Sequence, residues 1–185
     1  LWDKKNIKDF SVWEGVILGI ISDQEYHWNF KHLSTLSSIN WCESILQSRK
    51  SEWDWVYLSE HSKYFSFNLK RPGEIVKRIR KFGQYIDFAS LSKRFDVKLT
   101  AERLSELMDY SWDWNAISSN KSYELSAELV QNNNTLSWDW YAISSRKDCI
   151  FSTDFICENS HYQWNWECLS KRKDIQLTAD MILSL

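Results

Sequence analysis

Apolar positions recur along this chain with a period of about 26 residues. The first of them in each copy falls at Trp2, Trp28, Trp53, Ile86, Trp112, Trp138 and Trp164, at intervals of 26, 25, 33, 26, 26 and 26 residues. Five residues later comes a second apolar position, Ile7, Leu33, Leu58, Leu91, Ile117, Ile143 and Leu169, which Ser follows in six of the seven copies. Self-similarity at a fixed period is typical of repeat architectures, so we expect a tandem array.

The polar positions predict where helices begin. An Asp or Asn follows the first apolar position in every copy, and these residue types accept hydrogen bonds from the first turn of a helix. In the copy with Asp139 as N-cap, Trp138 is N′, Trp140 is N1 and Ile143 is N4, the arrangement of a hydrophobic staple. The pattern predicts a short helix from Trp140, with both indoles buried between units.

The second half of each unit repeats this pattern. An apolar residue and a hydroxyl residue stand together at Leu99-Thr100, Leu125-Ser126, Phe151-Ser152 and Leu177-Thr178, and each pair precedes an acidic residue. Short helices are unstable alone and must stack on neighbours. We therefore expect an all-α protein, an α-solenoid of about seven two-helix units: 2–27, 28–52, 53–85 with an insertion, 86–111, 112–137, 138–163 and 164–185.

Composition adds few constraints. The 185 residues carry a net charge of −2, and the longest apolar run, Val16 to Ile21, is far shorter than the ~20 residues that span a bilayer. The four cysteines form no CxxC pair, which favours a reduced, cytoplasmic setting. Because Leu1 is not Met and the last residues follow an apolar helical pattern, we expect a piece of a longer polypeptide.

The repeated W-D-W-x-x-[LI]-S unit resembles the tryptophan-rich tandem repeats of large DNA viruses and of assorted bacterial proteins. The resemblance covers essentially the whole chain and specifies a repeat type without specifying an activity. Some bacterial members look like recognition arms of larger proteins, which implies a nuclease or antiviral, phage-defence setting as one alternative. The Asn-Pro turn usual in such repeats is replaced here by Asn120-Lys121 and Arg146-Lys147.

Two groups of basic residues are candidate binding sites. The insertion at 70–85 holds Lys70, Arg71, Lys77, Arg78, Arg80 and Lys81 against Glu74 alone, so its net charge is +5 and the rest of the chain carries −7. Ile75, Val76, Ile79 and Phe82 predict a buried stripe with the cations facing outward. Such a face could bind phosphates or an acidic protein. The alternatives are a solvated face with no partner and a face that neutralises the acidic remainder.

The second group lies in the turns, at Lys93, Arg94, Arg146, Lys147, Lys171, Arg172 and Lys173. Stacking would align these cations along one ridge. However, Arg94, Arg146 and Arg172 each have an Asp two residues later, and the copy with Asn120 has Ser122 there. This co-occurrence favours local Arg–Asp contacts that order the turns.

No motif indicates catalysis or a cofactor. Cys157 and His161 are compatible with two metal ligands on one helix, but no second pair accompanies them, so we expect no metal site. The sequence therefore predicts a non-catalytic binding or scaffolding arm for a protein partner, or for the remainder of its own polypeptide. The alternative is a nucleic-acid-binding arm that uses the basic insertion and turns to contact DNA or RNA.

Overall fold

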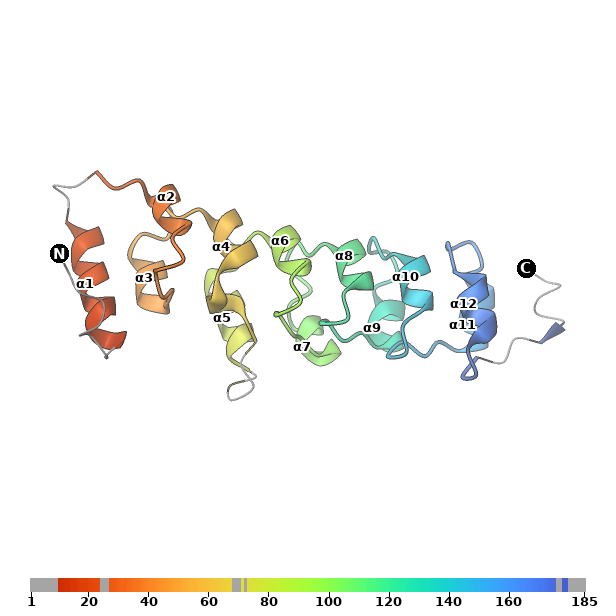
Figure 1. Cartoon of the computed structure of the whole chain (residues 1–185). Coiled ribbons are helices and arrows are strands. Elements are labelled where there is room, and N and C mark those ends of the chain that lie inside the picture. Colours follow the sequence, from red (N-terminus) through yellow and green to blue (C-terminus); the bar gives the residue numbers. More distant parts are fainter. Residues whose placement is uncertain (1–9, 24–26, 68–70, 72, 176–177, 180–185) are drawn as a thin grey trace.

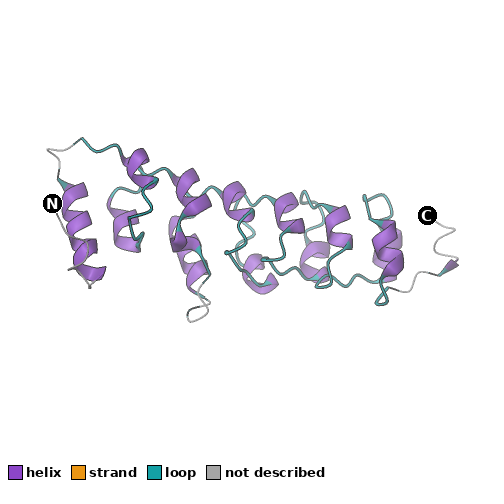
Figure 2. Cartoon of the chain, viewed as in Figure 1, coloured by secondary structure: helices purple, strands orange, loops and turns teal. Residues whose placement is uncertain are grey.

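The structure is a computed structural model that describes residues 10–23, 27–67, 71, 73–175 and 178–179. These residues form twelve α-helices and one 3-10 helix (Figure 2), and their one β-type pairing is an isolated bridge between Leu99 and Tyr123. None of the helices in the described ranges is long and apolar enough to cross a membrane. The predicted all-α solenoid is confirmed.

The helices form two rows along an elongated array (Figure 1). The first helices of successive units are α2 (Phe30–Ser34), α4 (Trp55–His61), α6 (Phe88–Ser92), α8 (Trp114–Ser119), α10 (Trp140–Ser144) and α12 (Trp166–Lys171). The second helices are α3 (Glu43–Ser48), α5 (Glu74–Phe82), α7 (Ala101–Ser105), α9 (Ala127–Asn132) and α11 (Thr153–Glu158). From α2 to α12, each first helix packs against the next one along the chain.

The two ends and the third unit depart from this plan. The N-terminal unit contains the longer helix α1 (Phe10–Ser22), which packs against α3. The third unit adds the 3-10 helix η1 (Lys63–Phe65) between α4 and α5. The predicted helix after Thr178 lies almost entirely outside the described residues.

The predicted N-caps of the helices from α4 to α11 are confirmed in both rows. Asp139 accepts a hydrogen bond from the Ala142 N–H at 3.0 Å, and Asp54, Asp87 and Asp113 cap α4, α6 and α8 in the same way. In the second row, Thr100, Ser126 and Ser152 cap α7, α9 and α11 through their hydroxyl groups. Each cap satisfies one of the N–H groups that a first helical turn leaves free.

The tryptophans fill the junctions between units. Trp138 and Trp140 are only 6% and 8% exposed, and the ring of Trp138 lies 4.9 Å from that of Trp114 in the preceding unit. The same N1-to-N′ contact joins Phe30 to Trp53, Phe88 to Trp112 and Trp140 to Trp164. Burying one indole contributes about 4–6 kcal/mol before chain entropy is subtracted. The indoles are thus the core between repeats, as the pattern predicts.

The indole N–H groups explain why these positions hold Trp and not another large apolar residue. The Nε1–H groups of Trp112, Trp138 and Trp164 donate to the carbonyls of Leu107, Asn133 and Asn159, at 2.8–2.9 Å. Each of these carbonyls stands at or just beyond the C-terminus of the preceding second helix. A helix C-terminus leaves carbonyls without partners, so each indole both packs on a neighbour and caps it.

The Ser that follows the second apolar position joins consecutive first helices. Ser118 is fully buried; its Oγ donates to the Trp114 carbonyl at 2.7 Å and accepts from the Asp139 N–H of the next unit at 3.0 Å. The hydroxyls of Ser34, Ser92 and Ser144 make the same pair of bonds, and Ser59 accepts from Asp87. A small hydroxyl side chain is the residue type that can donate within its own helix and accept from the next.

Replacing Ser118 with Ala should therefore destabilise the array. The change leaves the half-buried N–H of Asp139 without its acceptor, which costs about 1–3 kcal/mol of unfolding free energy. The adjacent Ser119 is exposed and bonds only within its own helix, so Ser119→Ala serves as the matched control. Chemical denaturation measures both variants, and equal effects would contradict the role assigned to Ser118.

Candidate functional site

The inserted helix α5 buries the predicted apolar stripe. Ile75, Val76, Ile79 and Phe82 are all at most 7% exposed. The helix also ends against the next unit, because a Cβ on Gly83 would lie 2.3 Å from Cε1 of Tyr110. The insertion is therefore an integral part of the packed array.

The basic residues of the insertion lie in different environments, and Arg78 is half-buried with its Nε 4.0 Å from Glu74. Arg80 pairs with Glu106 of the fourth unit at 2.7 Å, and Lys81 pairs with Glu43 of the second unit. Lys77 and Arg71 are exposed, whereas Lys70 lies outside the described residues. Ion pairs at such exposed positions contribute about 0–1 kcal/mol each, so they orient α5 between its neighbours more than they stabilise it.

The turn arginines reach into the preceding unit. Arg146 is 4% exposed, and its Nη1 donates to the carbonyls of Ile117, Ser118 and Asn120 at 3.2–3.3 Å. Its Nε donates to Asp148 at 2.9 Å. These carbonyls belong to the end of α8, where a helix lacks N–H partners. Arg146 is thus a buried cap for the first helix of the neighbouring unit.

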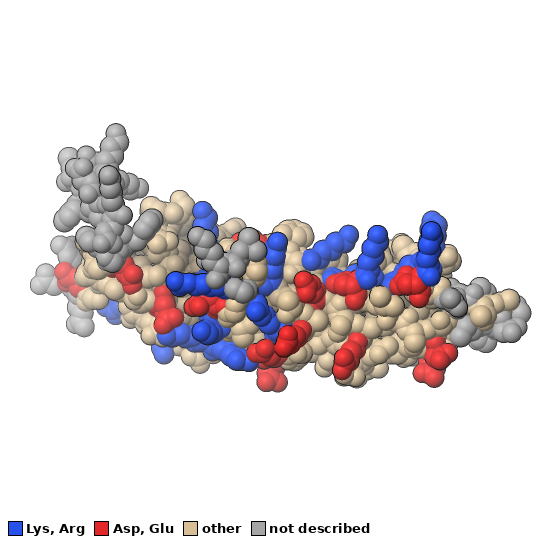
Figure 3. All heavy atoms as spheres, turned by 90° about the horizontal axis from the view of Figure 1, so that it is seen from below, with Lys and Arg blue, Asp and Glu red and all other residues tan. Residues whose placement is uncertain are grey.

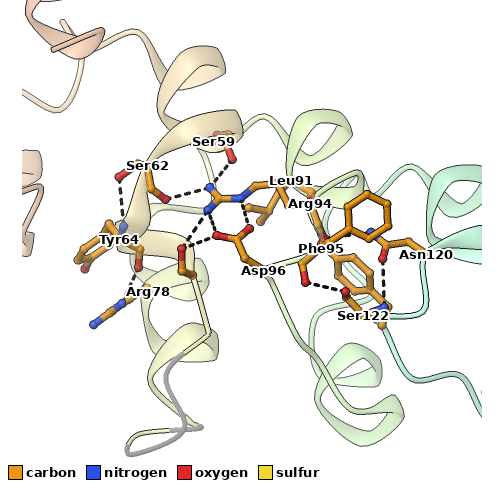
Figure 4. A network of polar contacts seen from close by, with 12 residues as sticks. Ser59, Ser62, Tyr64, Arg78, Leu91, Arg94, Phe95, Asp96, Asn120 and Ser122 are labelled. Carbon is orange, nitrogen blue, oxygen red and sulfur yellow. Dashed lines mark hydrogen bonds and ion pairs between the residues drawn. The ribbon is translucent and has the colours of Figure 1, made fainter. Parts of the chain in front are cut away.

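Arg94 and Arg172 make the same connection, and we call all three the junction arginines. Arg94 bonds Asp96 and the carbonyls of Ser59 and Ser62 (Figure 4). Arg172 bonds Asp174 and the carbonyls of Ser144, Arg146 and Cys149. The local Arg–Asp contact inferred from the sequence is confirmed at all three positions. Arg94 and Arg146 lie in the interior, and Arg172 is half-buried.

In the copy without an arginine, an amide side chain binds the carbonyls at the end of the preceding first helix. Asn120 is buried and its Nδ2 donates to the carbonyls of Ser92 and Arg94, each at 3.0 Å. Its Oδ1 accepts from the N–H of Ser122, whose hydroxyl donates to the Phe95 carbonyl (Figure 4). A neutral cap needs no counter-ion, which explains why Ser122 replaces the Asp.

The carboxylates beside the junction arginines remain ionised. Hydrogen bonds from Arg94 lower the pKa of Asp96 to about 2. Burial alone would raise the pKa of Asp148, but bonds from Arg146 and from the Leu125 N–H outweigh it and lower that pKa. Hydrogen bonds from Arg172 likewise lower the pKa of Asp174. Each pair is therefore an internal charge pair of the fold, with both partners engaged.

The lysines of the turns remain at the surface. Lys93, Lys121, Lys147, Lys171 and Lys173 are all exposed, and we call them the turn lysines. Figure 3 shows Lys and Arg side chains following one edge of the C-terminal half, with Asp and Glu beside them and on the opposite edge. Of the turn lysines, Lys171 pairs with Glu167 at 2.6 Å, an exposed contact within one helix. Lys121, Lys147 and Lys173 stand at the same position of three successive units, 26 residues apart.

Among the cysteines, Cys149 is buried, while Cys42, Cys157 and Cys168 are half-buried. Burial raises the pKa of the Cys149 thiol to about 12, so this thiol is unreactive at neutral pH. Among the described residues, no three His, Cys, Asp or Glu side chains are grouped as a metal site, Cys157 and His161 included.

Replacing Arg146 with Ala should strongly destabilise the junction between the fifth and sixth units. The change leaves four carbonyls, those of Ile117, Ser118, Asn120 and Tyr123, and Asp148 without their buried partner, which costs about 3 kcal/mol of unfolding free energy. Lys147→Ala, at the exposed neighbouring residue, should change stability by no more than about 0.5 kcal/mol. Thermal and chemical unfolding test this pair, and a stable Arg146→Ala variant would contradict the capping role.

Comparison of the chain with known protein families, with curated proteins and with solved structures found no match.

Proposed function

We propose that this array is a non-catalytic binding or scaffolding arm that recognises an acidic macromolecular surface through its turn lysines. The observation that supports it most is their placement: exposed Lys121, Lys147 and Lys173 recur at the same position of three successive units, while the junction arginines are fixed by Asp partners. A row of weak, repeated contacts suits a partner that engages several units together, since the binding free energy is then spread along the array.

Exposed apolar side chains on the turns add to this surface. Phe95 is 75% exposed beside Lys93, and Ile150 is 59% exposed beyond Lys147. The carbonyl of Phe95 is held by Ser122 at 2.7 Å, so its backbone is positioned by the fold. Apolar groups set among cations favour a protein partner, because protein interfaces combine a charged rim with a few apolar anchors.

A nucleic acid is the second candidate partner. A linear row of lysines matches a linear polyanion. Two more exposed cations are Lys77 on α5 and Arg71, which precedes this helix. The kinship with tryptophan-rich repeats proposed from the sequence is compatible with either partner.

Fluorescence anisotropy with labelled polyglutamate and a labelled single-stranded oligonucleotide of equal charge tests both candidates. Lys121→Glu/Lys147→Glu should weaken binding of the true partner class about tenfold or more at low salt. Lys31→Glu/Lys50→Glu, which makes the same charge change at exposed positions of the second unit, should leave it unchanged.

Preference for polyglutamate supports a protein partner. Preference for the oligonucleotide, with a steep salt dependence that the double variant flattens, supports the nucleic-acid candidate. Absence of binding to both probes at low salt contradicts the proposal.

A further inference from the structure

A cavity of about 940 Å³ lies between the second and third units. One wall is formed by the loop that leaves α2, residues 34–41, and the other by the end of α4, η1 and Arg78 of α5. Small-molecule sites in proteins have volumes of about 300–1,000 Å³. The cavity is therefore large enough for a ligand of metabolite size.

The cavity occupies the place that a junction arginine fills elsewhere. His61 stands three residues after Leu58, as Arg94 follows Leu91 and Arg172 follows Leu169, but its side chain is exposed and lies beside Glu60. Arg172 binds the carbonyls of Ser144, Arg146 and Cys149. Their counterparts in the second unit are Ser34, Leu36 and Ile39, and all three line the cavity.

The charge of this junction is reversed relative to the others. The position of Asp96, Asp148 and Asp174 is held here by Lys63, which lines the cavity together with Arg78 and His61. None of the described residues that line it is acidic. Of the nearby acids, Glu43 pairs with Lys81, Glu74 lies 4.0 Å from Arg78, and Glu60 lies 3.6 Å from His61 at the surface. The cavity thus favours an anion over the guanidinium bound at the other junctions.

A buried hydroxyl group at this site has no hydrogen-bond partner. Tyr64 lines the cavity, is 7% exposed, and its phenol oxygen is the unsatisfied buried side-chain atom among the described residues. Burial raises the pKa of Tyr64 to about 12, so the group remains a donor. Figure 4 shows Tyr64 pointing away from Arg94, with Arg78 beside it. A buried donor without an acceptor is unfavourable, and an anionic ligand that reaches this oxygen would supply the acceptor.

Aromatic rings complete the lining. Trp41 and Tyr57 face the cavity from its two walls, and Arg78 lies over the ring of Tyr64 with its guanidinium carbon 4.5 Å from the centroid. Planar ligands stack on such rings, while arginine and lysine bind phosphate oxygens through charge-assisted hydrogen bonds.

We propose that this cavity binds a phosphate monoester that carries a planar ring, with the phosphate between Lys63 and Arg78 and the ring against Trp41 and Tyr57. This site is independent of the turn lysines and of the partner they recognise.

NMR of the full chain labelled with 15N-tryptophan tests the proposal, with the Trp41 indole signal assigned by Trp41→Phe. Adenosine monophosphate should shift this signal, with an affinity about tenfold or more above that of adenosine or of inorganic phosphate. Lys63→Glu should weaken binding about tenfold. Lys77→Glu, the same charge change on the exposed face of α5, should leave it within about twofold.

A second variant restores the missing junction arginine. His61→Arg/Lys63→Asp should fill the cavity with the new side chain, abolish the shift caused by adenosine monophosphate and raise the denaturation midpoint. The proposal is overturned if adenosine monophosphate leaves the Trp41 signal unshifted, or if agmatine, a guanidinium compound, shifts it instead. It is also overturned if adenosine monophosphate still binds to Lys63→Glu or to the variant with the restored arginine.

Discussion

Helices of five or six residues leave most of their backbone groups without partners inside the helix, and this constraint shapes every junction of the array. A helix has four free N–H groups at its start and four free carbonyls at its end, and in α8 or α10 these include nearly the whole helix. The repeated polar residues supply the missing partners. Asp139 and Ser126 cap the starts, while the indole of Trp138 and the guanidinium of Arg146 cap the ends in the preceding unit. Capping of the helix C-termini and stacking between units are thus the same set of contacts.

The contacts at the junctions also indicate which junction has room for a ligand. In the regular units, Arg–Asp or Asn–Ser pairs fill the space between consecutive first helices, and their polar groups are hydrogen-bonded there. The junction between the second and third units has His61 and Lys63 at those positions and contains the cavity. Helix α5 contributes Arg78 to the lining of this cavity. Its Arg80 and Lys81 pair with Glu106 of the fourth unit and Glu43 of the second unit.

Much of the fold could be predicted from the sequence because its signals are local. N-caps such as Asp139 and Thr100 act within three residues, the stripe Ile75 to Phe82 has helical spacing, and Arg146 lies two residues from Asp148. The polar contacts between units were not predictable in the same way. The Ser118 hydroxyl meets a residue 21 positions away, and Arg146 reaches carbonyls 26 to 29 positions away. The cavity did leave a signal, the change from Arg-x-Asp to His61-Ser62-Lys63, but its meaning depends on knowing what the arginine binds.

Deletion of one complete unit, residues 112–137, tests the central claim most directly. If nearest neighbours supply all the capping contacts, Arg146 and Trp138 meet equivalent partners in the fourth unit, so the shortened chain should remain helical. Circular dichroism should then show an unchanged signal per residue, with cooperative unfolding at a lower free energy because one junction is missing. A shortened chain that loses its helical signal, or that keeps the full stability of the parent, would contradict the account.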